Sequence, residues 1–167
     1  PRNLSPDHIR AERGRGAPPR RGPPSPSSFA GILPPMQIVS ALFVENFEMR
    51  QAPGPSTRID MTGVMFSQAA PSPAPVTVTP HLVALIHCSE GEVGNGVFEV
   101  IFRRGLDEES EQVARNVSPF TVEPGKFTYR LVRGELDFPD YGQVFAHCRV
   151  DHGPWHPVPF TLLPPAE

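Results

Sequence analysis

Residues 81–103 constrain the fold more than any other stretch, because they have the pattern of two β-strands joined by a glycine-rich turn. Residues 81–88 are apolar on both faces but too short for a helix, which is typical of a strand in the middle of a sheet. Residues 97–103 alternate, and the apolar face consists of Phe98, Val100 and Phe102. We therefore expect an antiparallel hairpin at the centre of a β-sandwich, with Glu99 facing solvent.

The rest of the chain consists of short alternating runs between turn residues. Further strands are expected near residues 38–44, 57–66, 112–117, 127–133, 144–150 and 156–162. Gly63 marks a bulge or a close backbone approach. Residues 45–50 are interpreted as a frayed strand end, and the prolines of 156–162 place that strand at an edge.

Residues 106–117 offer the one arguable helix, but their apolar stripe is thin, so an acidic loop leading into an edge strand is favoured. Without a helix to carry a parallel crossover, the strands indicate an all-β fold. We predict an antiparallel two-sheet sandwich, immunoglobulin-like, with about seven or eight strands.

The expected core follows from the same alternation. The side chains predicted to be buried are Leu82, Ile86, Phe98, Val100, Phe102, Phe127, Tyr129, Leu131 and Phe160. On residues 57–66, those expected to point inward are Ile59, Met61, Val64 and Phe66.

Composition divides the chain at Met36. Residues 1–35 hold 9 prolines and 6 arginines against two acids, have no apolar periodicity and are predicted to be disordered. Such a basic, proline-rich segment suits nucleic-acid binding or a polyproline helix, although we favour its lying upstream of a natural start at Met36. Residues 36–163 are the predicted sandwich domain and 164–167 a short tail.

The predicted domain is acidic. The whole chain has a net charge of −3, and residues 1–35 contribute 6 − 2 = +4, so the remainder carries −3 − 4 = −7. This charge argues against nucleic acid or an anionic membrane surface as the partner. Apolar runs are too short to span a membrane, and no secretory signal is visible, so we expect a cytoplasmic location.

The order of segments resembles a family of uncharacterised bacterial proteins, a domain of unknown function with an immunoglobulin-like sandwich. The segments that carry this resemblance are residues 39–47, 58–66, 80–86, 98–102, 139–145, 151–153 and 158–162. The resemblance implies the fold and covers nearly all of the chain after Met36. It implies neither an activity nor an active site.

A repeated dipeptide, His87-Cys88 and His147-Cys148, is the sharpest chemical feature. Neighbours along a strand point to opposite faces, so one dipeptide cannot supply two ligands to a tetrahedral metal. We favour small buried cysteines with free thiols and histidines at the rim, with a disulfide and a metal site as open alternatives. No catalytic residue, cofactor or metal is predicted.

Two function classes remain. The favoured hypothesis is a non-catalytic binding or assembly module whose loops or exposed edge strand contact another protein. The alternative is a metal-binding protein or minor enzyme that uses His87, Cys88, His147 and Cys148. Zinc analysis and thiol counting distinguish the two.

Overall fold

The computed structural model describes residues 36–54 and 56–167, and the predictions for residues 1–35 lie outside this part of the chain. The described residues form eleven β-strands and no helix. The strands are β1 (Met36–Gln51), β2 (Thr57–Met65), β3 (Ser67–Ala69), β4 (Val76–Val78), β5 (His81–Cys88), β6 (Asn95–Arg103), β7 (Gln112–Thr121), β8 (Phe127–Arg133), β9 (Leu136–Phe138), β10 (Gly142–Val150) and β11 (His156–Leu163).

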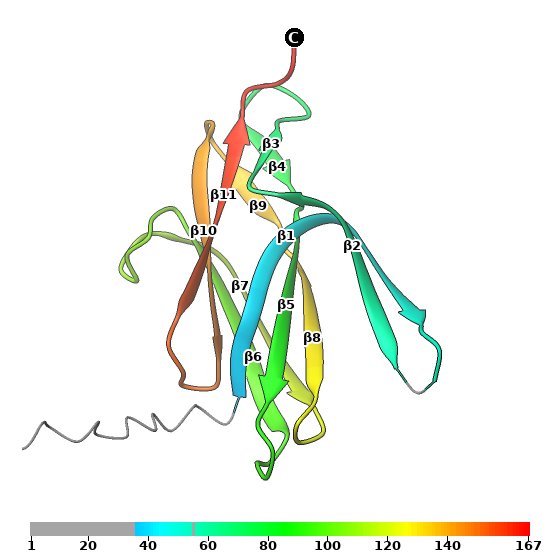
Figure 1. Ribbon diagram of the computed structural model, residues 1–167. Helices are drawn as coiled ribbons and strands as arrows, with labels where there is room; N and C mark the ends of the chain where they lie inside the picture. The colour runs from blue at the N-terminus through cyan, green and yellow to red at the C-terminus, as the bar shows by residue number, and fades with distance from the viewer. Residues whose placement is uncertain (1–35, 55) are drawn as a thin grey trace, which may run out of the picture. The chain divides into compact units, whose positions relative to one another are not determined.

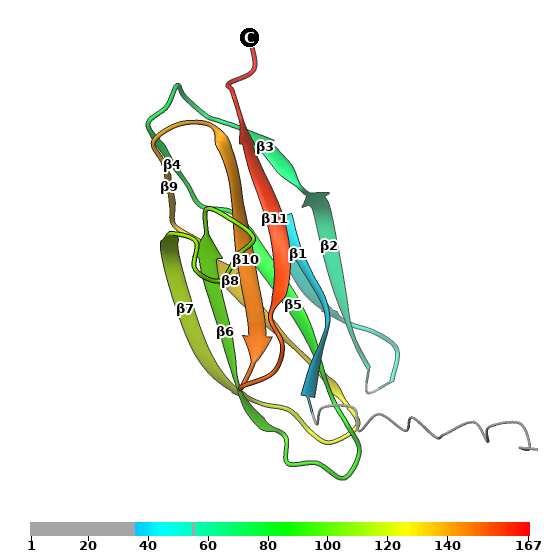
Figure 2. The same cartoon turned by 90° about the vertical axis from the view of Figure 1, so that its left-hand side faces the viewer.

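Two large sheets enclose one hydrophobic core (Figures 1 and 2). The four-stranded sheet has the order β2-β1-β5-β8, and the five-stranded sheet has the order β3-β11-β10-β6-β7. A two-stranded ribbon pairs β4 with β9. All pairings are antiparallel except β3 with β11, so the predicted all-β antiparallel sandwich is confirmed. The strands beyond the expected number, β3, β4 and β9, have three residues each.

The apolar strand β5 lies in the middle of its sheet, between β1 and β8, as predicted. Its inward side chains, Leu82, Ala84, Ile86 and Cys88, belong to the common core. Val83 on its outer face is buried as well. A strand that is buried on both sides explains the unbroken apolar run.

The predicted hairpin between residues 81–88 and 97–103 is wrong. β6 lies in the opposite sheet, between β10 and β7. Beside the end of β5, the backbone of Cys88 donates to Lys126 O and accepts from Gly125 N, both at 3.0 Å. The turn before β8 therefore occupies the position that a hairpin partner would take, and residues 89–94 cross to the other sheet instead.

The inward face of β8 is the reverse of the prediction. Phe127 and Leu131 are exposed and Tyr129 is half-buried, whereas Thr128, Arg130 and Val132 point toward the core. β8 is an edge strand, so an inward arginine can reach the open side of the sandwich. The Arg130 guanidinium lies 4.8 Å from the Phe120 ring centroid and donates to Pro119 O. The other predicted core residues, on β5, β6 and β11, are buried.

The end of β1 is not frayed. Residues 46–51 pair with Thr57–Thr62 of β2, beyond the last β1–β5 pair, Val44 with His81. We call this ribbon, residues 45–54 and 56–64, the β1–β2 arm. Its backbone pairs neither with β5 nor with another strand of the described chain.

The register of the arm corrects two inward assignments. It continues without a shift through Gly63, so Met65 packs against the core while Val64 and Phe66 are exposed. The pairing shows neither a bulge nor a close backbone approach at Gly63, because the group that lies against it is the Glu45 side chain. Its φ of 64° lies in the left-handed region, which favours glycine. Ile59 and Met61 are half-buried.

Two predictions about edge strands agree with the topology. β7 follows an acidic loop and lies at the edge of the five-stranded sheet. β11 has β3 beside it only at Thr161–Leu163. Thr161 N–H donates to Phe66 O, away from β10, so by alternation the imide nitrogens of Pro157 and Pro159 also face the open edge.

Candidate functional site

The two cysteines lie in the shared core, on strands of opposite sheets. Cys88 ends β5 and Cys148 lies within β10. Both are buried and free, as the sequence predicts. Burial raises the pKa of the Cys148 thiol to about 12, so this group stays protonated and is a poor nucleophile at neutral pH.

The two histidines lie on opposite outer faces of the sandwich. His87 packs against Phe127 with ring centroids 4.8 Å apart. His147 is buried on the other side, where its Nε2 atom lies 3.1 Å from Gly105 O and its ring lies edge-on to Trp155.

The four residues proposed as an alternative site are therefore not brought together. Two side chains point into the core and two point outward in opposite directions. Within residues 36–54 and 56–167, no group of three or more His, Cys, Asp or Glu side chains is arranged to hold a metal ion. In each His-Cys dipeptide, the two side chains point to opposite faces because neighbours along a strand alternate.

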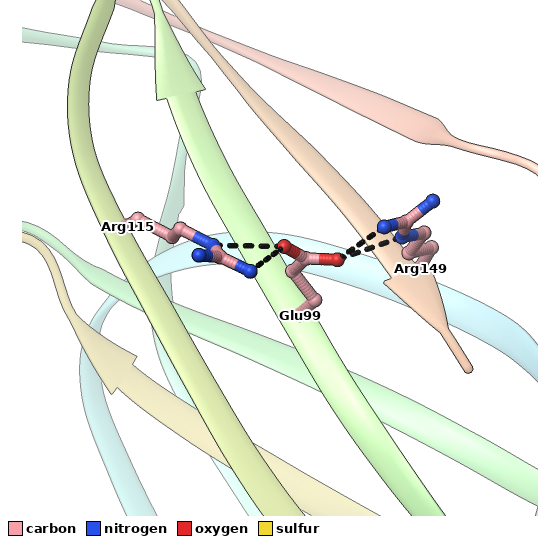
Figure 3. A network of polar contacts seen from close by, with 3 residues as sticks. All are labelled: Glu99, Arg115 and Arg149. Carbon is pink, nitrogen blue, oxygen red and sulfur yellow. Dashed lines mark hydrogen bonds and ion pairs between the residues drawn. The ribbon is translucent and has the colours of Figure 1, made fainter. Parts of the chain in front are cut away.

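Glu99 is buried, which corrects the prediction that it faces solvent. It lies on the outer face of β6 between Arg115 of β7 and Arg149 of β10 (Figure 3). Arg115 donates to Oε1 from Nε at 2.8 Å and from Nη2 at 2.7 Å. Arg149 donates to Oε2 from Nε at 2.7 Å and from Nη2 at 2.6 Å. One carboxylate thus connects three neighbouring strands.

The environment keeps Glu99 ionised. Burial opposes the charge, but hydrogen bonds from Arg149 and Arg115 outweigh it and hold the pKa of Glu99 below its usual range. The Arg149 guanidinium also lies 4.1 Å from the Trp155 ring centroid, which restricts its position. Because both carboxylate oxygens already accept two hydrogen bonds, Glu99 is suited to holding strands together rather than to acid–base chemistry.

A groove lies on the opposite side of the molecule, between the β1–β2 arm and the outer face of the four-stranded sheet. Its volume is about 470 Å³, within the range of small binding sites. The lining residues are Met49, Thr57 and Ile59 from the arm and Leu85, Phe127, Thr128 and Tyr129 from the sheet.

Phe47 and Tyr129 approach each other between the arm and β8, with ring centroids 4.8 Å apart. Other apolar side chains of this region remain open to solvent: Met49 is 51% exposed, Phe127 62% and Leu131 45%. Isolated exposed apolar residues are common, but a group of them lining a groove marks a contact surface. This groove is our candidate functional site.

Sequence reasoning missed both features for one reason each. The groove was hidden because Phe127, Tyr129 and Leu131 alternate as cleanly as a core face does. One feature of the sequence could have indicated the Glu99 network: Glu99 is a lone carboxylate in the middle of an otherwise apolar strand. If such a carboxylate is buried, it needs cationic partners.

A search of protein-family models and a search of curated proteins both find no match to this chain. In the described part of the chain, no helix is long and apolar enough to cross a membrane.

Proposed function

We propose that the protein is a non-catalytic binding module whose groove accepts an extended, apolar segment of another protein. The observation that supports this function is the exposure of Met49 and Phe127 on facing walls of the groove. Burying both side chains against a ligand would remove apolar surface from water, which is the main favourable term in association.

The groove also defines the chemistry of its ligand. Its lining contains no charged residue, and the polar side chains on its walls are those of Thr57 and Tyr129. β8 pairs on one side only, with β5, so its other edge offers backbone N–H and C=O groups to an added strand. We infer a peptide in extended conformation, with apolar side chains at alternate positions.

The experiment is selection of peptides from a random library on the immobilised domain, followed by calorimetry with the selected peptides. Phe127→Asp places a charge in the groove and is expected to abolish binding. Phe66→Asp is the matched control, because Phe66 is 64% exposed but lies outside the groove lining. Selected peptides that bind Phe127→Asp as well as the unmodified protein would overturn the proposal.

The proposal includes a cytoplasmic location and keeps the resemblance to the bacterial sandwich family, and fractionation of native host cells tests the location. The metal or enzyme hypothesis that uses His87, Cys88, His147 and Cys148 gains no support from their separation. Stoichiometric zinc in the purified protein would revive it.

A further inference from the structure

We propose that two copies of this chain associate through the outer half of β1, residues 46–51, paired antiparallel across a two-fold axis. In this arrangement Met49 lies opposite Met49 of the second copy. The inference goes beyond the proposed function and does not rest on it, because it depends on the backbone edge of the arm, although Met49 also lines the groove.

The first argument is that this edge is open. The pairing of β1 with β5 ends at Val44 and His81, and residues 46–51 of β1 pair with β2 alone. In Figure 1 the end of β1 lies on the outer side of β2, at the right of the described chain. Of residues 45–51, all except the half-buried Phe47 are exposed.

The second argument is that the edges of the five-stranded sheet carry features that oppose strand pairing. On β7, these features are Pro119 and a register shift in the pairing with β6. β11 has two prolines facing its open edge and β3 beside its end. Inward charges, prolines and bulges are the usual protection of edge strands. Within the described residues, the outer half of β1 has none of them.

The third argument is charge complementarity. The sequence Glu48-Met49-Arg50 places an acid and a base on either side of an apolar residue. A two-fold axis at Met49 brings Glu48 of each copy opposite Arg50 of the other. Shifting the axis by one residue would instead place Glu48 opposite Glu48, or Arg50 opposite Arg50, and directly opposed like charges destabilise a strand pair.

Arg50 remains able to make this contact. Its guanidinium already binds Asp60 across the arm, with Nη2 3.2 Å from Oδ1. A guanidinium carries five N–H donors, so one group can bind Asp60 and Glu48 of the second copy together.

Pairing with a second copy would extend the two-stranded β1–β2 arm into a larger sheet. An isolated two-stranded ribbon is marginally stable at best in water, and three or more strands with an apolar face are needed for independent stability. In each arm, Phe47 pairs with Met61 and Met49 with Ile59 on one face. Two arms would form a four-stranded sheet, β2-β1-β1-β2, with these apolar residues on a single face.

The register is tested by disulfide trapping in the full chain. Opposed residues on antiparallel strands have Cα atoms within disulfide range, so Met49→Cys is expected to form a covalent dimer under mild oxidation. Gln51→Cys is the matched control, because the two cysteines would lie about 13 Å apart. The native Cys88 and Cys148 are buried and should not compete. Equal trapping of both variants, or of neither, would overturn the register.

The complementarity is tested by charge reversal, with sedimentation equilibrium at high protein concentration because the interface is small. Glu48→Arg alone and Arg50→Glu alone place like charges opposite each other, so each should dimerise at least about tenfold more weakly than the unmodified chain. An equimolar mixture of the two variants restores opposite charges and should form a heterodimer. An unmodified chain that stays monomeric, or a mixture that fails to recover, would refute the proposal.

Discussion

On the outer face of the five-stranded sheet, Glu99 is enclosed by Arg115 and Arg149, and Trp155 packs on Arg149. On the outer face of the four-stranded sheet, Phe127 and Leu131 are exposed beside a groove. Both faces belong to one sandwich with one core. On the first face, the charge of Glu99 is therefore paired with arginines of the same chain. On the second face, apolar side chains remain exposed to solvent.

The difference shows how each sheet uses its outer side chains. A buried carboxylate is tolerated only with cationic partners, so the Glu99 network connects β6, β7 and β10 and has no bonding capacity left for a ligand. Exposed aromatic side chains cost little stability and can gain binding energy. We infer that the first face contributes to stability and the second to recognition.

The largest predicted effect comes from the core that both faces share. Phe102→Ala removes a fully buried aromatic ring and should lower the free energy of unfolding by about 3–5 kcal/mol. Phe127→Ala, on the exposed face, should change it by less than about 0.5 kcal/mol. Urea titrations followed by the fluorescence of Trp155 measure both values. Similar losses in the two variants would show that the inner and outer faces are misassigned.

A smaller effect is expected from the enclosed charge. Glu99→Gln keeps the shape but removes the acceptor charge between two arginines, so it should cost about 1–3 kcal/mol in the free energy of unfolding. Glu111→Gln is the control, because Glu111 is largely exposed and its ion pair with Arg104 is worth little. If both variants lose the same free energy of unfolding, the Glu99 network does not contribute to the stability of this sheet.

The same carboxylate predicts a pH dependence. Because the pKa of Glu99 is lower in the folded than in the unfolded state, the unfolded state binds its proton first as the pH falls. The contribution of Glu99 is therefore complete above its ordinary pKa of about 4.5 and is lost below it. Urea titrations at several pH values should show the advantage over Glu99→Gln shrinking in acid. A constant difference would contradict the lowered pKa.

The smallest expected effect concerns residues 1–35. Their lack of apolar periodicity predicts that a chain starting at Met36 melts at the same temperature as the full chain. Differential scanning calorimetry of both chains is the measurement. A loss of more than a few degrees would show that this segment contributes to the stability of the domain.

Much of the fold was predictable from local patterns. The strand β5, the edge position of β7, the open edge at the prolines of β11 and the inward residues Phe98, Val100 and Phe102 of β6 all follow from alternation and proline chemistry. The candidate site was not predictable in this way. Alternation tells which residues of a strand share a face, but it does not tell which face turns inward when both are partly apolar, as in β8.

The sequence by itself determined the all-β class, the strand positions and the burial of Cys88 and Cys148, because these depend on short-range periodicity and side-chain size. Only the tertiary structure decided which strands are neighbours. It separated β6 from β5 and placed Arg115 and Arg149 around Glu99. It also set the β1–β2 arm opposite Phe127 and Tyr129. These contacts join residues far apart in the chain, so no local pattern encodes them.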